Sequence, residues 1–138
     1  MGSFETWSDG SPMYYRIGED GRTPIPTDLL GMADCLEMNP IRHTYFYDRA
    51  TGKRVAWVST IFLGFDHRHI GTGEDPLLFE TMIFGGHLDQ NQLRFATWEE
   101  AMAVHKRINF IVWWTELLSE FPGGFRLARW LFERKERL

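Results

Sequence analysis

The amino-acid sequence predicts a single α+β domain, in which a small antiparallel sheet of about three to five strands packs against two or three helices. Its 138 residues suffice for one hydrophobic core, because 43% of them are hydrophobic and 25% are charged. Aromatic and β-branched runs separated by turn-rich links indicate hairpins, and other segments have helical periodicity. We therefore treat residues 1–138 as one domain with its core in residues 13–121.

The N-terminal part predicts a hairpin followed by a helix. Residues 13–25 contain a weakly alternating run and the pair Asp-Gly at 20–21, which is a strong signal for a tight turn. Thr27 then offers an N-cap for a helix over residues 28–37. The apolar stripe expected on this helix consists of Leu29, Met32, Cys35 and Leu36.

The middle of the chain predicts the main strands. Residues 43–47 and 53–65 are joined by the turn-rich link 48–52, which indicates a second hairpin. Both alternating faces of the second run are apolar, so we expect a central strand that is covered on each side. Residues 77–84 predict a third main strand, antiparallel to the one before it. Strict alternation places Val55, Trp57, Ser59, Ile61, Leu63 and Phe65 on one face and Val58, Thr60 and Phe62 on the other.

The C-terminal part predicts a long helix and a short one. Thr97-Trp98-Glu99-Glu100 is a capping box, so the long helix begins at Trp98. Beyond Asn109 its apolar and polar faces are no longer separated, and further aromatic residues fall on a second face. Residues 122–124, Pro-Gly-Gly, end this helix. We expect residues 125–138 to form an amphipathic basic helix that folds back onto those aromatic residues.

Composition excludes some functions. The net charge of −4 argues against bulk nucleic-acid binding, which needs a basic surface. A single cysteine, Cys35, is typical of a reducing compartment, so we expect a cytoplasmic protein. The longest apolar stretch, residues 108–118, is interrupted by polar side chains and too short to span a bilayer, so no membrane partner is expected.

The loop after the long strand gathers titratable residues at the end of a rigid element, where functional residues commonly lie. The sequence Asp-His-Arg-His at 66–69 precedes the glycine-bearing stretch 71–74. With nearby aromatic rings and arginines, these residues supply the groups that stack a base and hold a phosphate, which predicts a site for a nucleotide-like small molecule. The alternative is that the tryptophans are core residues and the arginines are solvated. The predicted ligand-binding residues are Trp57, Asp66, His67, Arg68, His69, Glu80, Arg94, Trp98 and His105.

A metal-dependent hydrolase is a further alternative. The residues that suit a divalent ion are Asp66, His67 or His69, Glu80 and His105. Their spacing matches no known metal motif and no GxSxG elbow is present, so we assign no catalytic residue, metal or cofactor. The structural alternative for Glu80 is a hydrogen bond or ion pair with an arginine or histidine, and for His105 a satisfied place in the core.

A second kind of partner is a protein. Trp113, Trp114 and Trp130 add aromatic surface beyond the one apolar face that a helix needs to pack on the sheet. Such extra aromatic surface is typical of an inhibitor that binds a host protein or of a homo-oligomer.

Three motifs carry a resemblance to a known family. They are VSTIFLGFDH at 58–67, PLLFETMIFGG at 76–86, and RFATWEEA at 94–101 with the following His105. On these motifs the chain resembles a family of small uncharacterised proteins from tailed bacteriophages and prophages, over roughly residues 14–106. The family brings no established activity, but the resemblance implies an accessory protein that acts in the host cytoplasm. Together with the absence of a catalytic signature, it favours binding rather than catalysis, with counter-defence as the expected role.

Overall fold

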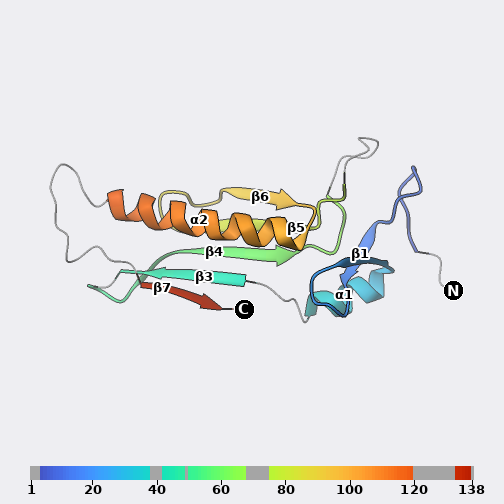
Figure 1. The fold of residues 1–138 in the computed structure, drawn as a ribbon, viewed down its shortest axis with the longest axis horizontal. Coiled ribbons are helices and arrows are strands. Elements are labelled where there is room, and N and C mark those ends of the chain that lie inside the picture. Colours follow the sequence, from blue (N-terminus) through green and yellow to red (C-terminus); the bar gives the residue numbers. More distant parts are fainter. Residues whose placement is uncertain (1–3, 38–41, 49, 68–74, 120–132, 138) are drawn as a thin grey trace.

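The computed structural model describes residues 4–37, 42–48, 50–67 and 75–119, and the backbone of residues 133–137. Within these residues the chain has two helices and two antiparallel sheets, which confirms the α+β class (Figure 1). The elements in chain order are β1 (Tyr14–Ile17), β2 (Pro24–Thr27), α1 (Leu29–Glu37), β3 (Arg42–Tyr47), β4 (Arg54–Phe62), β5 (Phe79–Phe84), β6 (Gln92–Phe95), α2 (Trp98–Ser119) and β7 (Glu133–Arg137).

The larger sheet has the strand order β6-β5-β4-β3-β7 and every pair in it is antiparallel. Strand β4 lies in the middle, as expected for an apolar run of that length. The sequence does not predict strand β6, because the alternation of polar and apolar residues in Gln92–Phe95 extends over only four residues, three of which are exposed. It forms because its backbone completes the hydrogen bonding of β5.

Helix α2 covers one face of this sheet and begins where the capping box predicts. The Thr97 hydroxyl accepts a hydrogen bond of 3.2 Å from the amide of Glu100. Beneath the helix lie two clusters of buried apolar side chains, one around Phe62 and one around Val58. Neither of the described helices is long and apolar enough to cross a membrane.

A β-bulge changes which side chains share a face. Tyr47 pairs with Arg54 whereas Phe46 pairs with Ala56, so Val55 is the extra residue of β4. Val55 packs against the buried cluster under α2. The predicted placement of Val55 on the same face as Trp57 is therefore wrong. Arg54 lies on the sheet face opposite α2.

The N-terminal hairpin and α1 pack at one end of the large sheet (Figure 1). The Tyr15 amide donates to the Gly64 carbonyl at 2.7 Å, and the buried Tyr15 ring joins the cluster around Phe62. The hairpin and α1 are confirmed, but the helix cap is not the predicted Thr27. The Asp28 carboxylate accepts a hydrogen bond of 2.7 Å from the Gly31 amide, because Asp28 directly precedes the first helical residue.

The prediction of a C-terminal helix over residues 125–138 is wrong for residues 133–137. These form β7, which pairs with the outer edge of β3 in the register Tyr47↔Glu133 to His43↔Arg137. The unpaired backbone groups of an edge strand are a strong template for another strand, and pairing there overrides the weak β-propensity of a charged segment. Residues 125–132, including Trp130, lie outside the described part of the chain.

Candidate functional site

The sheet face opposite α2, which we call the open face, carries a row of aromatic rings across three strands. Trp57 of β4 lies directly between its cross-strand partners Tyr45 of β3 and Phe84 of β5. The Tyr45 and Trp57 ring centres are 5.7 Å apart at 14°, and those of Trp57 and Phe84 are 4.4 Å apart at 18°. All three rings are half-buried, and none of the described helices packs on this face. The predicted cover on both sides of β4 is thus found only on the α2 side of the described structure.

A cation and a histidine lie beside this row. The exposed Arg54 guanidinium carbon is 5.3 Å from the Tyr45 ring centre and 5.8 Å from the Trp57 ring centre, within range for cation–π attraction. The His43 ring centre is 5.6 Å from that of Trp57. Burial lowers the pKa of His43, which favours the neutral ring at pH 7.

The other end of the open face carries charge. Glu80 of β5 and Arg94 of β6 are cross-strand partners, and Arg94 Nε donates to Glu80 Oε2 at 2.9 Å. This confirms the predicted ion pair for Glu80. On β5 Glu80 lies four residues before Phe84, which separates the ion pair from the aromatic row by about 13 Å along the strand.

Asp66 and His67 follow the end of β4. Asp66 is buried, and its carboxylate accepts a hydrogen bond of 3.3 Å from the Leu77 amide, so it ties this segment to the chain before β5. Burial, and then the Arg94 charge, lower the pKa of His67, while Glu80 and Asp66 oppose them. These electrostatic interactions place His67 near the ion pair. The predicted ligand residues Arg68 and His69 lie outside the described residues.

His105 lies on the opposite side of the sheet, under α2. It is fully buried, with Nδ1 2.6 Å from Thr60 Oγ1 and Nε2 2.8 Å from Thr44 Oγ1. Thr60 Oγ1 is also 2.6 Å from Thr81 Oγ1, and Asn109 Nδ2 donates to Thr44 Oγ1 at 2.9 Å. Burial is the largest cause that lowers the pKa of His105 to about 4, so the ring is neutral and acts as a core residue.

The combination of Asp66, His67, Glu80 and His105 in one metal site is therefore wrong. Glu80 is paired with Ile61 and projects to the open face, whereas His105 bonds residues of the α2 side. Among the described residues, no three His, Cys, Asp or Glu side chains lie together as metal ligands would.

Trp98 is also separated from Trp57. It is half-buried at the start of α2, packs against the cluster around Phe62, and the Arg22 guanidinium carbon lies 4.6 Å from its ring centre. Because α2 and the open face are on opposite sides of the sheet, the two tryptophans do not share a site.

Sequence reasoning missed the residues that surround Trp57, namely Tyr45, Phe84, Arg54 and His43. The aromatic identity of the strands was visible, but the cross-strand register and the bulge at Val55 decide which side chains meet.

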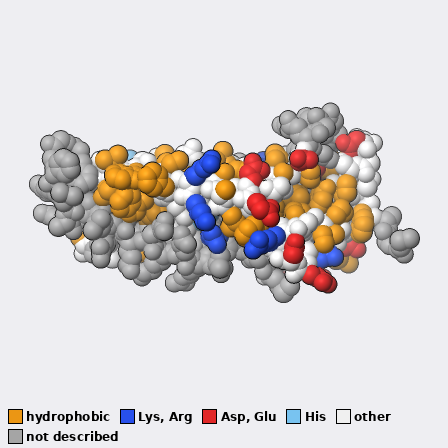
Figure 2. Space-filling model, in the orientation of Figure 1, with side chains coloured by type: hydrophobic (Ala, Val, Ile, Leu, Met, Phe, Trp, Pro, Cys, Tyr) orange, Lys and Arg blue, Asp and Glu red, His pale blue; other side chains and the backbone are white. Residues whose placement is uncertain are grey.

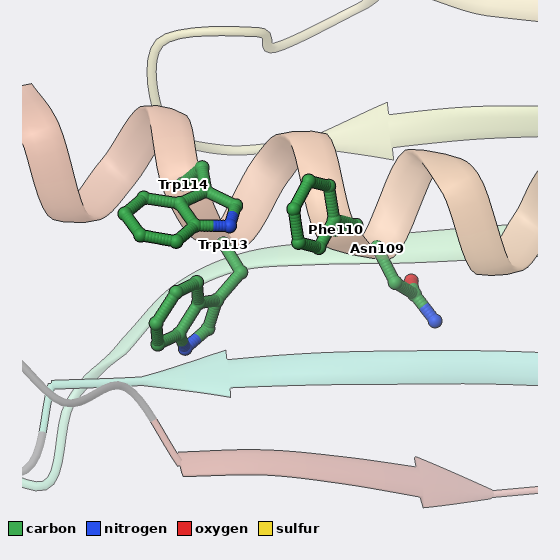
Figure 3. Close-up of a pocket in the computed structure, with 4 residues that line it drawn as sticks. All are labelled: Asn109, Phe110, Trp113 and Trp114. Carbon is green, nitrogen blue, oxygen red and sulfur yellow. The ribbon is translucent and has the colours of Figure 1, made fainter.

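A second candidate surface lies on α2. Figure 2 shows a patch of hydrophobic side chains over the C-terminal half of the helix, with lysine and arginine side chains beside it. Next to it is a hollow of about 320 Å³, near the lower limit for small-molecule pockets. Figure 3 shows Asn109 and Trp113 extending from the helix toward β3, while Phe110 and Trp114 lie along its outer side.

Comparisons of this chain with protein-family models, with curated proteins and with solved structures find no match.

Proposed function

We propose that this protein is a non-enzymatic binding protein, and that its open face captures a nucleotide-type ligand. The observation that carries the proposal is the aromatic row Tyr45–Trp57–Phe84 with the Arg54 guanidinium beside it. Rings and a cation gathered on a sheet face are the groups with which proteins stack bases and neutralise a phosphate.

The rest of the open face fits such a ligand. Arg94 is held by Glu80 at 2.9 Å and offers its remaining N–H groups as donors. The distance of about 13 Å between the aromatic row and the ion pair suits a ligand larger than one base, such as a cyclic dinucleotide. A net charge of −4 disfavours long nucleic acids but leaves one or two phosphates within reach of Arg54 and Arg94.

We expect the protein to bind the ligand and hold it without converting it. Within the described residues the histidine with the most perturbed pKa, His105, is enclosed in the core and lies away from the open face. The resemblance to bacteriophage proteins supports a role in the host cytoplasm, where removing a nucleotide signal would blunt a defence. Incubation with a bound nucleotide should therefore return that nucleotide chemically unchanged.

Thermal unfolding in the presence of AMP, GMP, CMP, UMP and cyclic di-GMP tests the proposal. At a concentration of 100 times its Kd, a bound ligand adds about 2.7 kcal/mol of stability, which raises the Tm of a domain of this size by about 8 °C. Arg54→Gln removes the cation of the aromatic row without disturbing the core, because Arg54 is exposed. We expect that variant to lose most of the ligand-dependent rise in Tm.

The matched control is Arg22→Gln, because Arg22 also lies over a tryptophan ring, that of Trp98, but on the other side of the sheet. It should keep the full response. If none of the five nucleotides raises the Tm of the unmodified protein, or if Arg54→Gln and Arg22→Gln respond alike, the proposed function is wrong.

A further inference from the structure

One side of α2 carries a stripe of exposed apolar residues, which we call the α2 stripe. Its members are Phe110 (63% exposed), Ile111 (51%), Trp114 (40%) and Leu118 (59%). Ile111, Trp114 and Leu118 follow one another at intervals of three and four residues, which is the spacing of a helix–helix seam, and Phe110 lies one turn before Trp114. Contiguous apolar surface of this kind on a folded chain commonly marks a protein interface.

The side chains on this side of α2 could pair with those of a second, antiparallel copy of the helix that crosses it at residues 110–111. Exposed Arg107 lies one turn before that centre and Trp114 one turn after it, while exposed Ala103 and Leu118 lie about two turns away on either side. In two antiparallel copies of the helix that cross at 110–111, Arg107 of each copy meets Trp114 of the other. A guanidinium over an indole face is favourable, and small Ala103 leaves room for the large Leu118.

A hollow and a hydrogen-bonded helix end lie beside the stripe. The hollow of about 320 Å³ beside Trp113 and Trp114 offers a recess for a bulky side chain, and anchors that fill such recesses dominate interface energetics. The helix is fixed at this end, because buried Glu116 accepts a hydrogen bond of 2.6 Å from the His87 amide.

We infer that a second copy of this chain docks on the α2 stripe, giving a two-fold symmetric dimer with its α2 helices antiparallel. Self-complementarity is what a two-fold interface requires, because the same patch must serve both partners. The inference goes beyond the proposed function and does not depend on it. Since α2 and the open face lie on opposite sides of the sheet, the dimer carries two outward-facing ligand surfaces.

Sedimentation equilibrium of the full chain tests the interface. Trp114→Ala removes the ring that meets Arg107 and should weaken dimerisation by roughly 30-fold or more, as expected for an interface hot spot. The control is Leu30→Ala, because Leu30 is 75% exposed on α1, away from the stripe, and its loss should leave the dimer unchanged. A chain that stays monomeric at its solubility limit, or equal dissociation constants for the two variants, would overturn the inference.

Disulfide crosslinking tests the antiparallel arrangement. In a Cys35→Ala background, Ile111→Cys lies next to the two-fold axis and should form a crosslinked dimer under mild oxidation, because disulfides need Cβ atoms about 4 Å apart. Ala103→Cys and Leu118→Cys should each stay monomeric alone and crosslink when the two variants are mixed. Crosslinking of Ala103→Cys with itself would indicate parallel helices, and no crosslink at position 111 would place the interface elsewhere; either result contradicts the inference.

Discussion

His105 is of a residue type that is common in active sites, but in this protein it is a hydrogen-bonded core residue. Its two ring nitrogens are each within 2.8 Å of a threonine hydroxyl, and the ring is fully buried. Burial of a polar side chain is tolerated only when its hydrogen bonds are made, and here both are. The sequence alone left a functional and a structural reading of this histidine open, because a core histidine and a poised base occupy the same kind of position on an apolar helix face.

The environment of His105 predicts acid sensitivity. Its pKa falls to about 4 in the folded chain, against 6.5 for an unperturbed histidine, so only the unfolded chain binds this proton between those two pH values. The resulting stability is complete above pH 6.5 and is lost as the pH falls to about 4, with a total on the order of 3 kcal/mol.

Urea unfolding at several pH values measures this effect. His105→Leu should lose this pH dependence and, because it leaves threonine hydroxyls without their ring partners, should cost about 1–3 kcal/mol at pH 7. The exposed neighbour Lys106 provides the control, since Lys106→Gln should keep the slope. An unchanged slope in His105→Leu would mean that another group is responsible.

At the scale of elements, the bulge in β4 decides what the open face contains. By inserting Val55, it places Arg54 on the same face as Tyr45 and Trp57. The turn after β5 packs closely against the backbone of the bulge. Gly85 has φ +76°, and a Cβ atom on it would lie 2.8 Å from the Val55 carbonyl oxygen.

This packing predicts unequal effects of two glycine substitutions. Gly52 also has a positive φ, +69°, but a Cβ there meets nothing within 4 Å. Gly52→Ala should therefore cost about 1 kcal/mol through backbone strain alone. Gly85→Ala should cost roughly 1–2 kcal/mol more, because the backbone of β4 must also shift. Equal losses in the free energy of unfolding would show that Gly85 does not constrain the bulge.

At the scale of the whole molecule, local sequence signals were enough for the fold class but not for the site. The turn at Gly21 and the capping box at Thr97 act over a few residues, so the N-terminal hairpin and the start of α2 could be predicted. Strands β6 and β7 depend on an available sheet edge, which only the assembled sheet provides.

Only some of the predicted site residues lie on the same face of the sheet. Trp57, Glu80 and Arg94 were identified by residue type and do share the open face, since their strands pair in register. Trp98 and His105 were assigned to the same site but lie on the other side of the sheet, and spacing along the chain could not separate them. A one-residue change of register reverses every side chain of a strand, so faces require pairing information.

The most direct test of the proposed ligand face is an NMR titration of the indole N–H signals with cyclic di-GMP. The chain has six tryptophans, of which Trp57 lies on the open face and Trp98 and Trp114 lie on α2. We expect the Trp57 signal to shift until the protein is saturated with ligand, while the signals of Trp98 and Trp114 stay in place. A shift at Trp114 or Trp98 without one at Trp57 would contradict the assignment of the ligand to the open face.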